Sequence, residues 1–282
     1  MKQVINRILE DAYLKSKTLE YKAEDWMTEE WASIKKYDVK KDKFSGIPLE
    51  RLRDLGEKVT VLPSTGNFHR LVKKIFEARS KSIESGKDID WGTAESLAFS
   101  SLIQDGFNVR ISGQDVERGT FSHRHAHVFY QDQNGKYTPI NNTVPQGIRR
   151  QFIASNSHLS EFAVLGYELG YSQANPNTLC LWEAQFGDFA NGAQVIIDQF
   201  IVSGEAKWNV KNGLVMLLPH GFDGQGPEHS SARVERYLQL CDQDDEVPFD
   251  GVNYDNKDIL KATNVQVVNC STAANYFHVL RT

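Results

Sequence analysis

Apolar residues recur at helical or strand spacing along most of this chain, and the pattern changes near residue 90. Before that point, three amphipathic stretches interrupted by many charges predict helices over 5–21, within 45–63 after Pro48, and over 68–85. Apolar residues of the third stretch share one helical stripe: Phe68, Leu71, Val72, Ile75 and Phe76. We therefore expect residues 1–88 to form a helical arm or linker that leads into a domain.

From residue 89 onward, helical stretches alternate with short apolar strands. The pattern predicts helices over 91–106, 160–171, 188–202, 230–241 and 272–281, and strands over 107–112, 178–182, 213–219 and 265–270. A continuous apolar run such as 213–219 indicates a strand that is buried on both faces, which is typical of parallel sheets covered by helices. The fold class is therefore α/β, with a doubly wound, mostly parallel sheet over 89–282.

Three polar, glycine-rich loops follow the predicted strands, at 112–127, 183–192 and 219–231. In doubly wound sheets, ligands bind beyond the carboxyl ends of the strands. Long loops of this kind also carry function more often than chance would give. We expect the functional site to lie where these loops meet.

Composition and charge narrow the classes of function. Hydrophobic residues make up 40% of the 282 positions and the net charge is −5, so we expect a globular protein without a nucleic-acid partner. No apolar run approaches the roughly 20 residues needed to cross a bilayer. Cys180, Cys241 and Cys270 form no C-x-x-C pair, and Glu10 and Asp11 make the first residues unlike a leader or transit peptide. A reducing compartment is favoured.

His123, His125 and His127 form the most visible spacing motif. On a strand, a period of two would place the three imidazoles on one face, where they could bind zinc or iron. Because no carboxylate or further histidine follows at a recognisable ligand spacing, hydrogen-bonding or substrate-binding roles are favoured over a metal site. Purely structural roles stay open.

Two further motifs have weak signals. Residues 221–226 superficially resemble a phosphate loop but lack the Walker lysine and the G-x-G-x-x-G spacing. Ser230 or Ser231 is predicted at a helix start, where free N–H groups could hold an anion near His229, although capping serines in an ordinary loop would give the same pattern. No G-x-S-x-G motif occurs, which argues against an α/β-hydrolase.

Glu161 opens an apolar helix directly after a serine-rich loop, with Ser160 as the predicted cap. An ionised glutamate in the first turn stabilises a helix, because its negative charge interacts favourably with the helix dipole. From the local pattern alone, that stabilising role is the simplest interpretation.

Taken together, these segments change the interpretation, because they closely resemble the thiamine-diphosphate-dependent dehydrogenase component of the 2-oxoglutarate dehydrogenase complex. The resemblance rests on 112–128, 156–171, 181–201 and 217–241, with 16–31 and 68–83 resembling the linker before the family's pyrimidine-binding domain. The family's diphosphate-binding domain carries a Gly-Asp-Gly run, which is absent from this sequence. We therefore expect a transketolase-like pyrimidine-binding domain over 89–282, without the diphosphate-binding and C-terminal domains.

The resemblance implies roles for single residues. Glu161 would be the glutamate that hydrogen-bonds the aminopyrimidine ring and activates the cofactor, which requires burial to raise its pKa despite the helix start. His229 would handle substrate as a catalytic histidine, and Phe186 or Phe189 would stack on the ring. The further candidates are Gln114 and Asp115 on the cofactor side, and His220 and His125 toward the substrate.

The implied activity is oxidative decarboxylation of 2-oxoglutarate and transfer of the succinyl group to lipoamide. The cofactor would be thiamine diphosphate, with Mg²⁺ on a partner diphosphate-binding domain and no metal on this chain. Such a chain would be inactive alone and would join a homo- or hetero-oligomer and the dihydrolipoyl succinyltransferase core, in the mitochondrial matrix or the bacterial cytoplasm. Alternatives are a 2-oxoadipate-specific relative, a non-catalytic assembly module and a histidine-based metal hydrolase.

Overall fold

The computed structural model describes residues 1–20, 31, 45–144, 147, 151–242 and 263–282, in two compact units, Met1–Lys35 and Lys36–Thr282. The first unit contains helix α1 (Lys2–Ser16), which confirms a helical N-terminal arm. None of the residues of α1 is buried, and its apolar positions Val4 and Ile8 are both 61% exposed. The second unit contains the sheet and all the remaining described elements.

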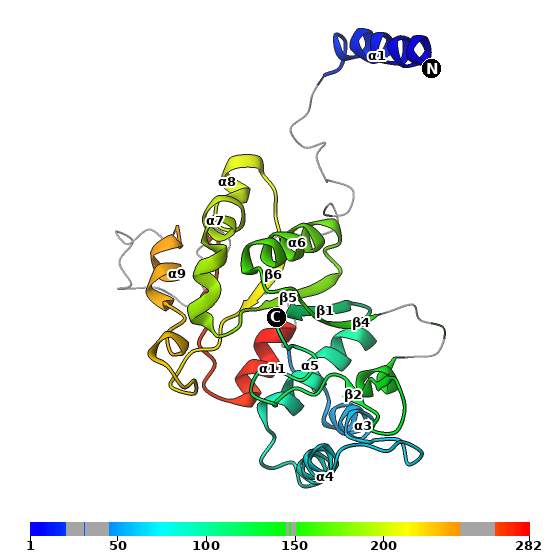
Figure 1. Cartoon of the computed structure of the whole chain (residues 1–282), viewed down its shortest axis with the longest axis vertical. Coiled ribbons are helices and arrows are strands. Elements are labelled where there is room, and N and C mark those ends of the chain that lie inside the picture. The colour runs from blue at the N-terminus through cyan, green and yellow to red at the C-terminus, as the bar shows by residue number, and fades with distance from the viewer. Residues whose placement is uncertain (21–30, 32–44, 145–146, 148–150, 243–262) are drawn as a thin grey trace. The chain divides into compact units, whose positions relative to one another are not determined.

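The central sheet has four parallel strands in the order β4 (Phe152–Asn156), β1 (Asn108–Gly113), β5 (Thr178–Glu183) and β6 (Leu214–Leu217) (Figure 1). This order confirms the predicted parallel α/β fold. Strand β4 was not predicted from the sequence pattern. A separate antiparallel pair, β2 (Val128–Phe129) and β3 (Lys136–Tyr137), lies outside this sheet.

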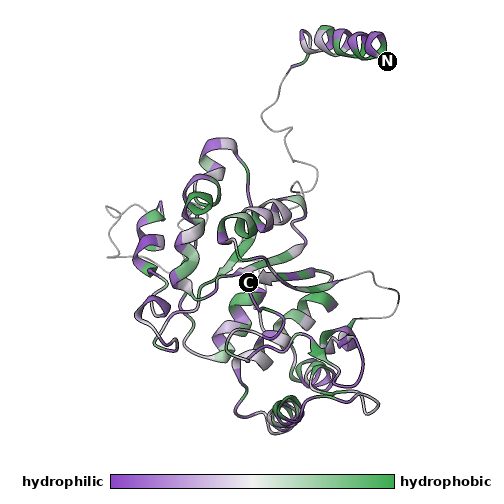
Figure 2. Cartoon of the chain, viewed as in Figure 1, coloured by the Kyte–Doolittle hydropathy of each residue, from purple (hydrophilic) through white to green (hydrophobic). Residues whose placement is uncertain are grey.

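Helices cover both faces of the sheet, as Figure 1 shows. Helices α5 (Trp91–Gln104) and α11 (Ala273–Arg281) lie on one face and α6 (Glu161–Ala174) lies on the other. Strand β5 shows why both faces are covered. Leu181 packs into the core that includes α5, and the next residue, Trp182, packs into the core that includes α6. Alternate side chains point to opposite faces of a strand, so an apolar strand needs a helical layer on each side. Figure 2 shows that much of the sheet between the helices is green, which marks hydrophobic residues.

Two helices of the predicted arm belong to the second unit. Helix α3 (Leu49–Val59) contributes Leu55 to the core beneath α5, and α4 (Arg70–Ser85) contributes Ile83. The other four residues of the predicted stripe pack in a separate small cluster with Val128, namely Phe68, which precedes α4, and Val72, Ile75 and Phe76. Leu71 does not belong to that cluster and is 56% exposed. The proposed boundary between residues 88 and 89 stays a prediction.

The stretch predicted as one helix over 188–202 is divided into three short pieces. A 3-10 turn, η3 (Gly187–Ala193), leads into α7 (Gln194–Ile196) and a π-helical turn, η4 (Ile197–Ile201); α8 (Gly204–Trp208) follows. Such π-helical turns are rare and occur frequently at functional sites. A further 3-10 turn, η2 (Pro139–Thr143), follows β3.

Two other predicted elements differ from the structure. Helix α9 (Val234–Leu240) begins later than predicted, after the 3-10 turn η5 (Pro227–His229), because Arg233 has a left-handed backbone conformation, with φ of +52°, that a right-handed helix cannot include. Residues 265–270 form no strand. Val268 is 55% exposed there, and an apolar run becomes a strand only where a neighbour supplies its hydrogen bonds.

Candidate active site

The carboxyl ends of the four parallel strands are aligned at one edge of the sheet. Gly113 lies opposite both Asn156 and Glu183, and Glu183 lies opposite Leu217. Each sequence-predicted site residue belongs to the chain segment directly after one of these ends. The register therefore brings those segments to a common edge, which is where ligands bind in open α/β sheets.

Glu161 begins helix α6 in the segment after β4. Ser160 caps the helix by accepting a hydrogen bond from the Ala163 N–H, as predicted. The Oε1 atom of Glu161 lies 3.4 Å from Nε2 of Gln114 and 3.4 Å from the backbone N of Gln185. Burial raises the pKa of Glu161, and the hydrogen bond from Gln185 opposes this shift only in part. The half-buried carboxyl group therefore binds a proton more readily than a glutamate in water.

A cluster of aromatic rings lies next to Gln185. The centre of the His229 imidazole lies 4.7 Å from the ring centre of Phe186 and 5.3 Å from the ring centre of Phe189, and both contacts are edge-to-face. Phe186 also meets Phe121 edge-to-face at 5.4 Å. Gly224 allows this packing, because a Cβ there would lie 2.2 Å from the Cβ of His229. The cluster unites three predicted residues and adds Phe121, which the sequence analysis did not identify.

Phe189 is the more exposed of the two candidate stacking rings, at 36%. Phe189 lies on η3, three residues before Gly192. Gly192 is close to Glu161, because a Cβ added at Gly192 would lie 3.5 Å from the Cβ of Glu161. Phe186 is more enclosed, between Phe121 and His229. An accessible aromatic face near the carboxyl group is what stacking on a heterocycle requires. This geometry favours Phe189.

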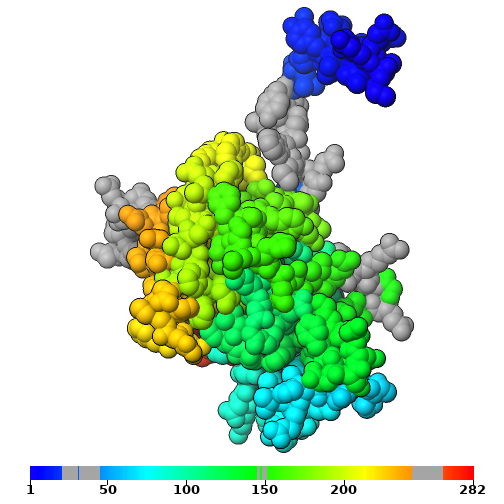
Figure 3. Space-filling view, in the orientation of Figure 1, coloured from blue at the N-terminus to red at the C-terminus, as the bar shows by residue number. Residues whose placement is uncertain are grey.

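The loop after β6 and the segment that begins at η3 lie side by side, as their gold and yellow-green surfaces show in Figure 3, and Asp188 connects them. Asp188 accepts a 2.7 Å hydrogen bond from the Ser231 N–H and forms a 2.8 Å ion pair with Arg233. His220 accepts a hydrogen bond from the Ala232 N–H through Nδ1. These N–H groups are therefore occupied, and the predicted anion site at a helix start near Ser230 or Ser231 is wrong. His220 organises the loop that carries His229.

The two residues predicted on the cofactor side, Gln114 and Asp115, have different partners. Gln114 turns toward the site and donates to both Glu161 and the Leu159 carbonyl. Asp115 instead forms an ion pair with Arg118, three residues further along the loop, and the Asp115 side chain is 41% exposed. Of the two residues, Gln114 is the one that contacts the central carboxyl group.

The three motif histidines do not share a strand face, so the geometry proposed for a metal site is wrong. His123 and His125 lie in an irregular loop. His127 contacts the Thr138 hydroxyl through Nδ1 at 2.8 Å and the Ala154 carbonyl through Nε2 at 3.1 Å, which is a structural role. Among the described residues there is no group of three or more side chains suited to hold a metal ion.

A fully buried charge cluster lies beside these loops. Arg124, 2% exposed, binds Glu95 through Nε at 2.5 Å and Glu183 through Nη2 at 2.5 Å. Tyr276 donates to Glu95 at 2.7 Å. The sequence analysis did not identify this cluster. One signal was present, because each glutamate is the only charged residue of its element, α5 or β5, and a buried carboxylate needs a cation.

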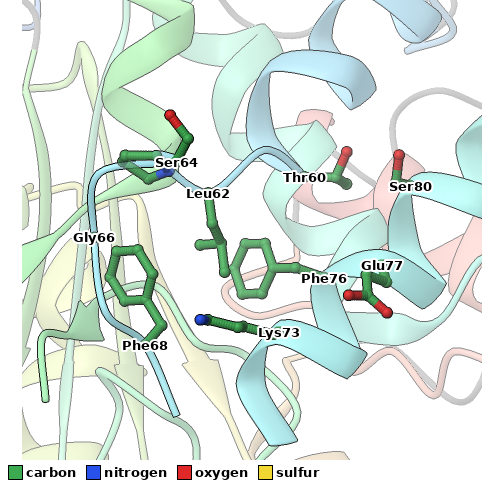
Figure 4. Close-up of a pocket in the computed structure, with 10 residues that line it drawn as sticks. Thr60, Leu62, Ser64, Gly66, Phe68, Lys73, Phe76, Glu77 and Ser80 are labelled. Atoms are coloured by element: carbon green, nitrogen blue, oxygen red, sulfur yellow. The ribbon is translucent and has the colours of Figure 1, made fainter. Parts of the chain in front are cut away.

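A separate cavity lies over helix α4, away from the strand ends (Figure 4). It has a volume of 340 Å³, and Leu62, Phe68 and Phe76 form its apolar wall, with Lys73 and Glu77 beside them. None of the sequence-predicted site residues lines it. The chemical groups that could act on a substrate are gathered instead around Glu161.

The raised pKa of Glu161 has a consequence for stability. An acid with a raised pKa in the folded state destabilises that state once it ionises, and this destabilisation disappears as the pH falls below the pKa of the unfolded chain. We expect Glu161→Gln to increase the free energy of unfolding at neutral pH, with the gain vanishing in acid. Urea denaturation across a pH series measures this; a loss of stability at neutral pH would contradict it.

Comparison with known proteins agrees with this geometry. Residues 87–282 match the family model described as transketolase, pyrimidine binding domain. Over 285 aligned residues, covering 100% of this chain and 28% of the relative, it is 48% identical to "2-oxoglutarate dehydrogenase, mitochondrial" of Dictyostelium discoideum. Over 260 residues, covering 91% of this chain and 24% of the relative, it is 50% identical to "2-oxoglutarate dehydrogenase E1 component" of Brucella ovis. The chain thus spans about a quarter of these relatives.

The described helices include none that is both long and apolar enough to cross a bilayer.

Proposed function

This chain belongs to the family of transketolase pyrimidine-binding domains, and on that premise we propose that it forms the aminopyrimidine side of the active site of a 2-oxoglutarate dehydrogenase. The activity proposed for the whole enzyme is thiamine-diphosphate-dependent oxidative decarboxylation of 2-oxoglutarate, followed by transfer of the succinyl group to lipoamide. The relatives named for this substrate support the choice.

One observation carries the proposal: the half-buried carboxyl group of Glu161, with a raised pKa, lies beside exposed aromatic surface at the carboxyl edge of the sheet. A carboxyl group with a raised pKa binds a proton more readily, and in its protonated form it can donate a hydrogen bond to a ring nitrogen and transfer that proton. A surface glutamate that only stabilised its helix would gain most from staying ionised. The donor set therefore fits an aminopyrimidine.

The residues divide the work. Glu161 would hold and move a proton at the ring nitrogen, Gln114 would orient the Glu161 carboxyl group, and Phe189 would offer a stacking face. Thiamine diphosphate, when bound, supplies the nucleophilic carbon that the side chains of a protein lack. His229, held by Phe186 and Phe189, would hydrogen-bond the carboxylate or keto oxygen of the substrate.

The proposal extends to partners. We infer that a diphosphate-binding domain, with its Mg²⁺, completes the site from another part of the enzyme or another chain. The assembled enzyme, as a homo- or hetero-oligomer, would deliver succinyl groups to a dihydrolipoyl succinyltransferase core. Its compartment would be the mitochondrial matrix in a eukaryote and the cytoplasm in a bacterium.

Substrate competition tests the proposal. The chain is combined with a diphosphate-domain partner, thiamine diphosphate and Mg²⁺, and carbon dioxide release is measured from 2-oxoglutarate and 2-oxoadipate. We expect kcat/KM to be higher for 2-oxoglutarate and to require both the cofactor and the partner. Preference for 2-oxoadipate would favour the 2-oxoadipate relative, whereas binding to the partner without turnover would favour an assembly module.

A further inference from the structure

A buried arginine outside the family-matched region supports the loop that carries two of the motif histidines. Arg79 lies on α4, before residue 87, and its side chain is 5% exposed. Its guanidinium donates to the backbone carbonyl of His123 through Nη2 at 2.5 Å and to that of Arg124 through Nη1 at 3.2 Å. Helix α4 therefore reaches into the loop after β1 and holds two consecutive carbonyl groups.

The loop held by Arg79 is conformationally strained. Ser122 and His125 adopt left-handed backbone conformations, with φ of +53° and +51°. Residues other than glycine avoid this region, and such outliers persist only where the surroundings impose them. The N–H groups of Arg124 and His125 both donate to the Arg118 carbonyl at 2.9 Å. Arg79 on one side and Arg118 on the other thus fix the turn.

Arg79 occupies an unusual place for a buried cation. The guanidinium lies against the first turn of α5, since a Cβ on Gly92 would be 2.6 Å from Nη2 of Arg79 and 1.9 Å from the His123 carbonyl oxygen. A cation at a helix N-terminus is repelled by the helix dipole. Burial lowers the pKa of Arg79, with Asp90 and Glu95 opposing that shift. The two carbonyl groups and Asp90 offset the cost of burying this cation, so its guanidinium is held in place by the turn that it contacts.

The turn is connected to the active site through side chains. The ring of His123 lies 5.8 Å from that of Phe121, which contacts Phe186 in the aromatic cluster. Thr120 donates to the Gln185 side chain at 2.9 Å, and the backbone N–H of Gln185 faces Glu161. A displacement of the turn would therefore reach both the aromatic cluster and the neighbours of the central carboxyl group.

We propose that Arg79 is a positioning residue for the active site, which acts from the preceding segment by clamping the backbone of the 122–125 turn and thereby setting Phe121 and His123 against the aromatic cluster. Only the catalytic consequence rests on the proposed function. The clamp itself is a property of this chain and can be measured without turnover.

The test compares Arg79→Lys with Arg281→Lys in the 282-residue chain. Lysine keeps the charge but lacks the planar fork that binds two carbonyl groups at once, so changes report geometry rather than lost charge. Arg281 is a matched control: its side chain is 10% exposed and it binds Asp105, Ser101 and the Ser45 carbonyl, joining α11 to α5. Imidazole NMR signals of His123 and His125 are followed across pH, with His69 as reference.

We expect Arg79→Lys to shift the signals and titration curves of His123 and His125 and leave His69 unchanged, whereas Arg281→Lys moves none of them. In the assembled enzyme, kcat/KM should fall about 10- to 100-fold for Arg79→Lys, the size of effect expected from misplacing active-site groups by up to an ångström. Unchanged His123 and His125 signals, or equal shifts in both variants, would overturn the clamp. Shifted signals with unchanged kcat/KM in an enzyme that depends on Glu161 would overturn the catalytic role.

If Arg79→Lys fails to fold, the same NMR measurement on Asp90→Asn tests the clamp. Asparagine preserves the cap of α5 while removing the charge 3.6 Å from Nε of Arg79, and the Asp90 side chain is 53% exposed. A smaller shift confined to the same two histidines supports the clamp, and no shift refutes it. If the enzyme proves independent of Glu161, the proposed function fails while the NMR result still stands.

Discussion

Replacing Glu161 by glutamine is expected to lower kcat for decarboxylation of 2-oxoglutarate by about 10²- to 10⁴-fold in the assembled enzyme, the range typical of a lost acid–base group. Glutamine keeps the size of the side chain and its capacity to accept hydrogen bonds from Gln114 and Gln185. Its amide group, however, acts neither as an acid nor as a base near neutral pH. Steady-state rates with saturating thiamine diphosphate measure this effect, and titration of the cofactor separates it from weaker binding.

Glu235→Gln provides the matched control. Glu235 is also a glutamate in the first turn of a helix, α9, and its side chain is exposed. A role limited to the helix dipole would make the two variants alike, with small effects on stability and none on rate. A Glu161→Gln enzyme that retained full turnover would remove Glu161 from the mechanism.

Arg124→Gln is expected to destabilise the fold by about 3–5 kcal/mol, as is typical when one partner of a buried ion pair is removed. The reason is the pair of carboxylates left behind. Glu95 and Glu183 lie within the core and share Arg124 as their buried cation at 2.5 Å. Burial is the largest single effect on Glu95 and would raise its pKa. Attraction to Arg124 and the hydrogen bonds from Arg124, with smaller contributions from His123 and Tyr276, together outweigh burial and lower the pKa.

The sign of the pH dependence distinguishes this mechanism from a packing defect. The lowered pKa of Glu95 gives the native protein stability that is present above the unfolded-state pKa and is lost as the pH falls through the folded-state value. Without Arg124, burial would raise the pKa, and protonation would relieve the variant in acid. The difference in unfolding free energy between the two proteins should therefore narrow as the pH falls; a constant difference would indicate lost packing.

Arg51→Gln is the control for Arg124→Gln. Arg51 pairs with Asp105 at 2.7 Å, but both side chains are about 30% exposed, at 30% and 31%. Partly exposed ion pairs contribute roughly 0–1 kcal/mol, because water already solvates the charges. Chemical denaturation of both variants should thus separate burial from the simple presence of an ion pair.

Prediction from the sequence succeeded where a local pattern was sufficient. Ser160 caps α6 as expected, because a cap depends only on neighbouring residues. It failed where distant segments compete for the same backbone groups. Ser231 starts no helix because Arg233, which forms an ion pair with the distant Asp188, has a left-handed backbone conformation, and residues 265–270 pair with no strand. Missing β4 had the same cause, since its pairing with β1 joins segments some 40 residues apart.

By itself the sequence determined the α/β fold class, the polar loops at the strand ends and the family resemblance centred on Glu161, because periodicity and short motifs are local. Only the tertiary structure decided what those loops bring together: that Gln114 rather than Asp115 contacts Glu161, that His127 is structural, and that Arg79 reaches the loop after β1. Burial, pKa and strain depend on neighbours supplied by other elements, so they arise only once the strands are in register.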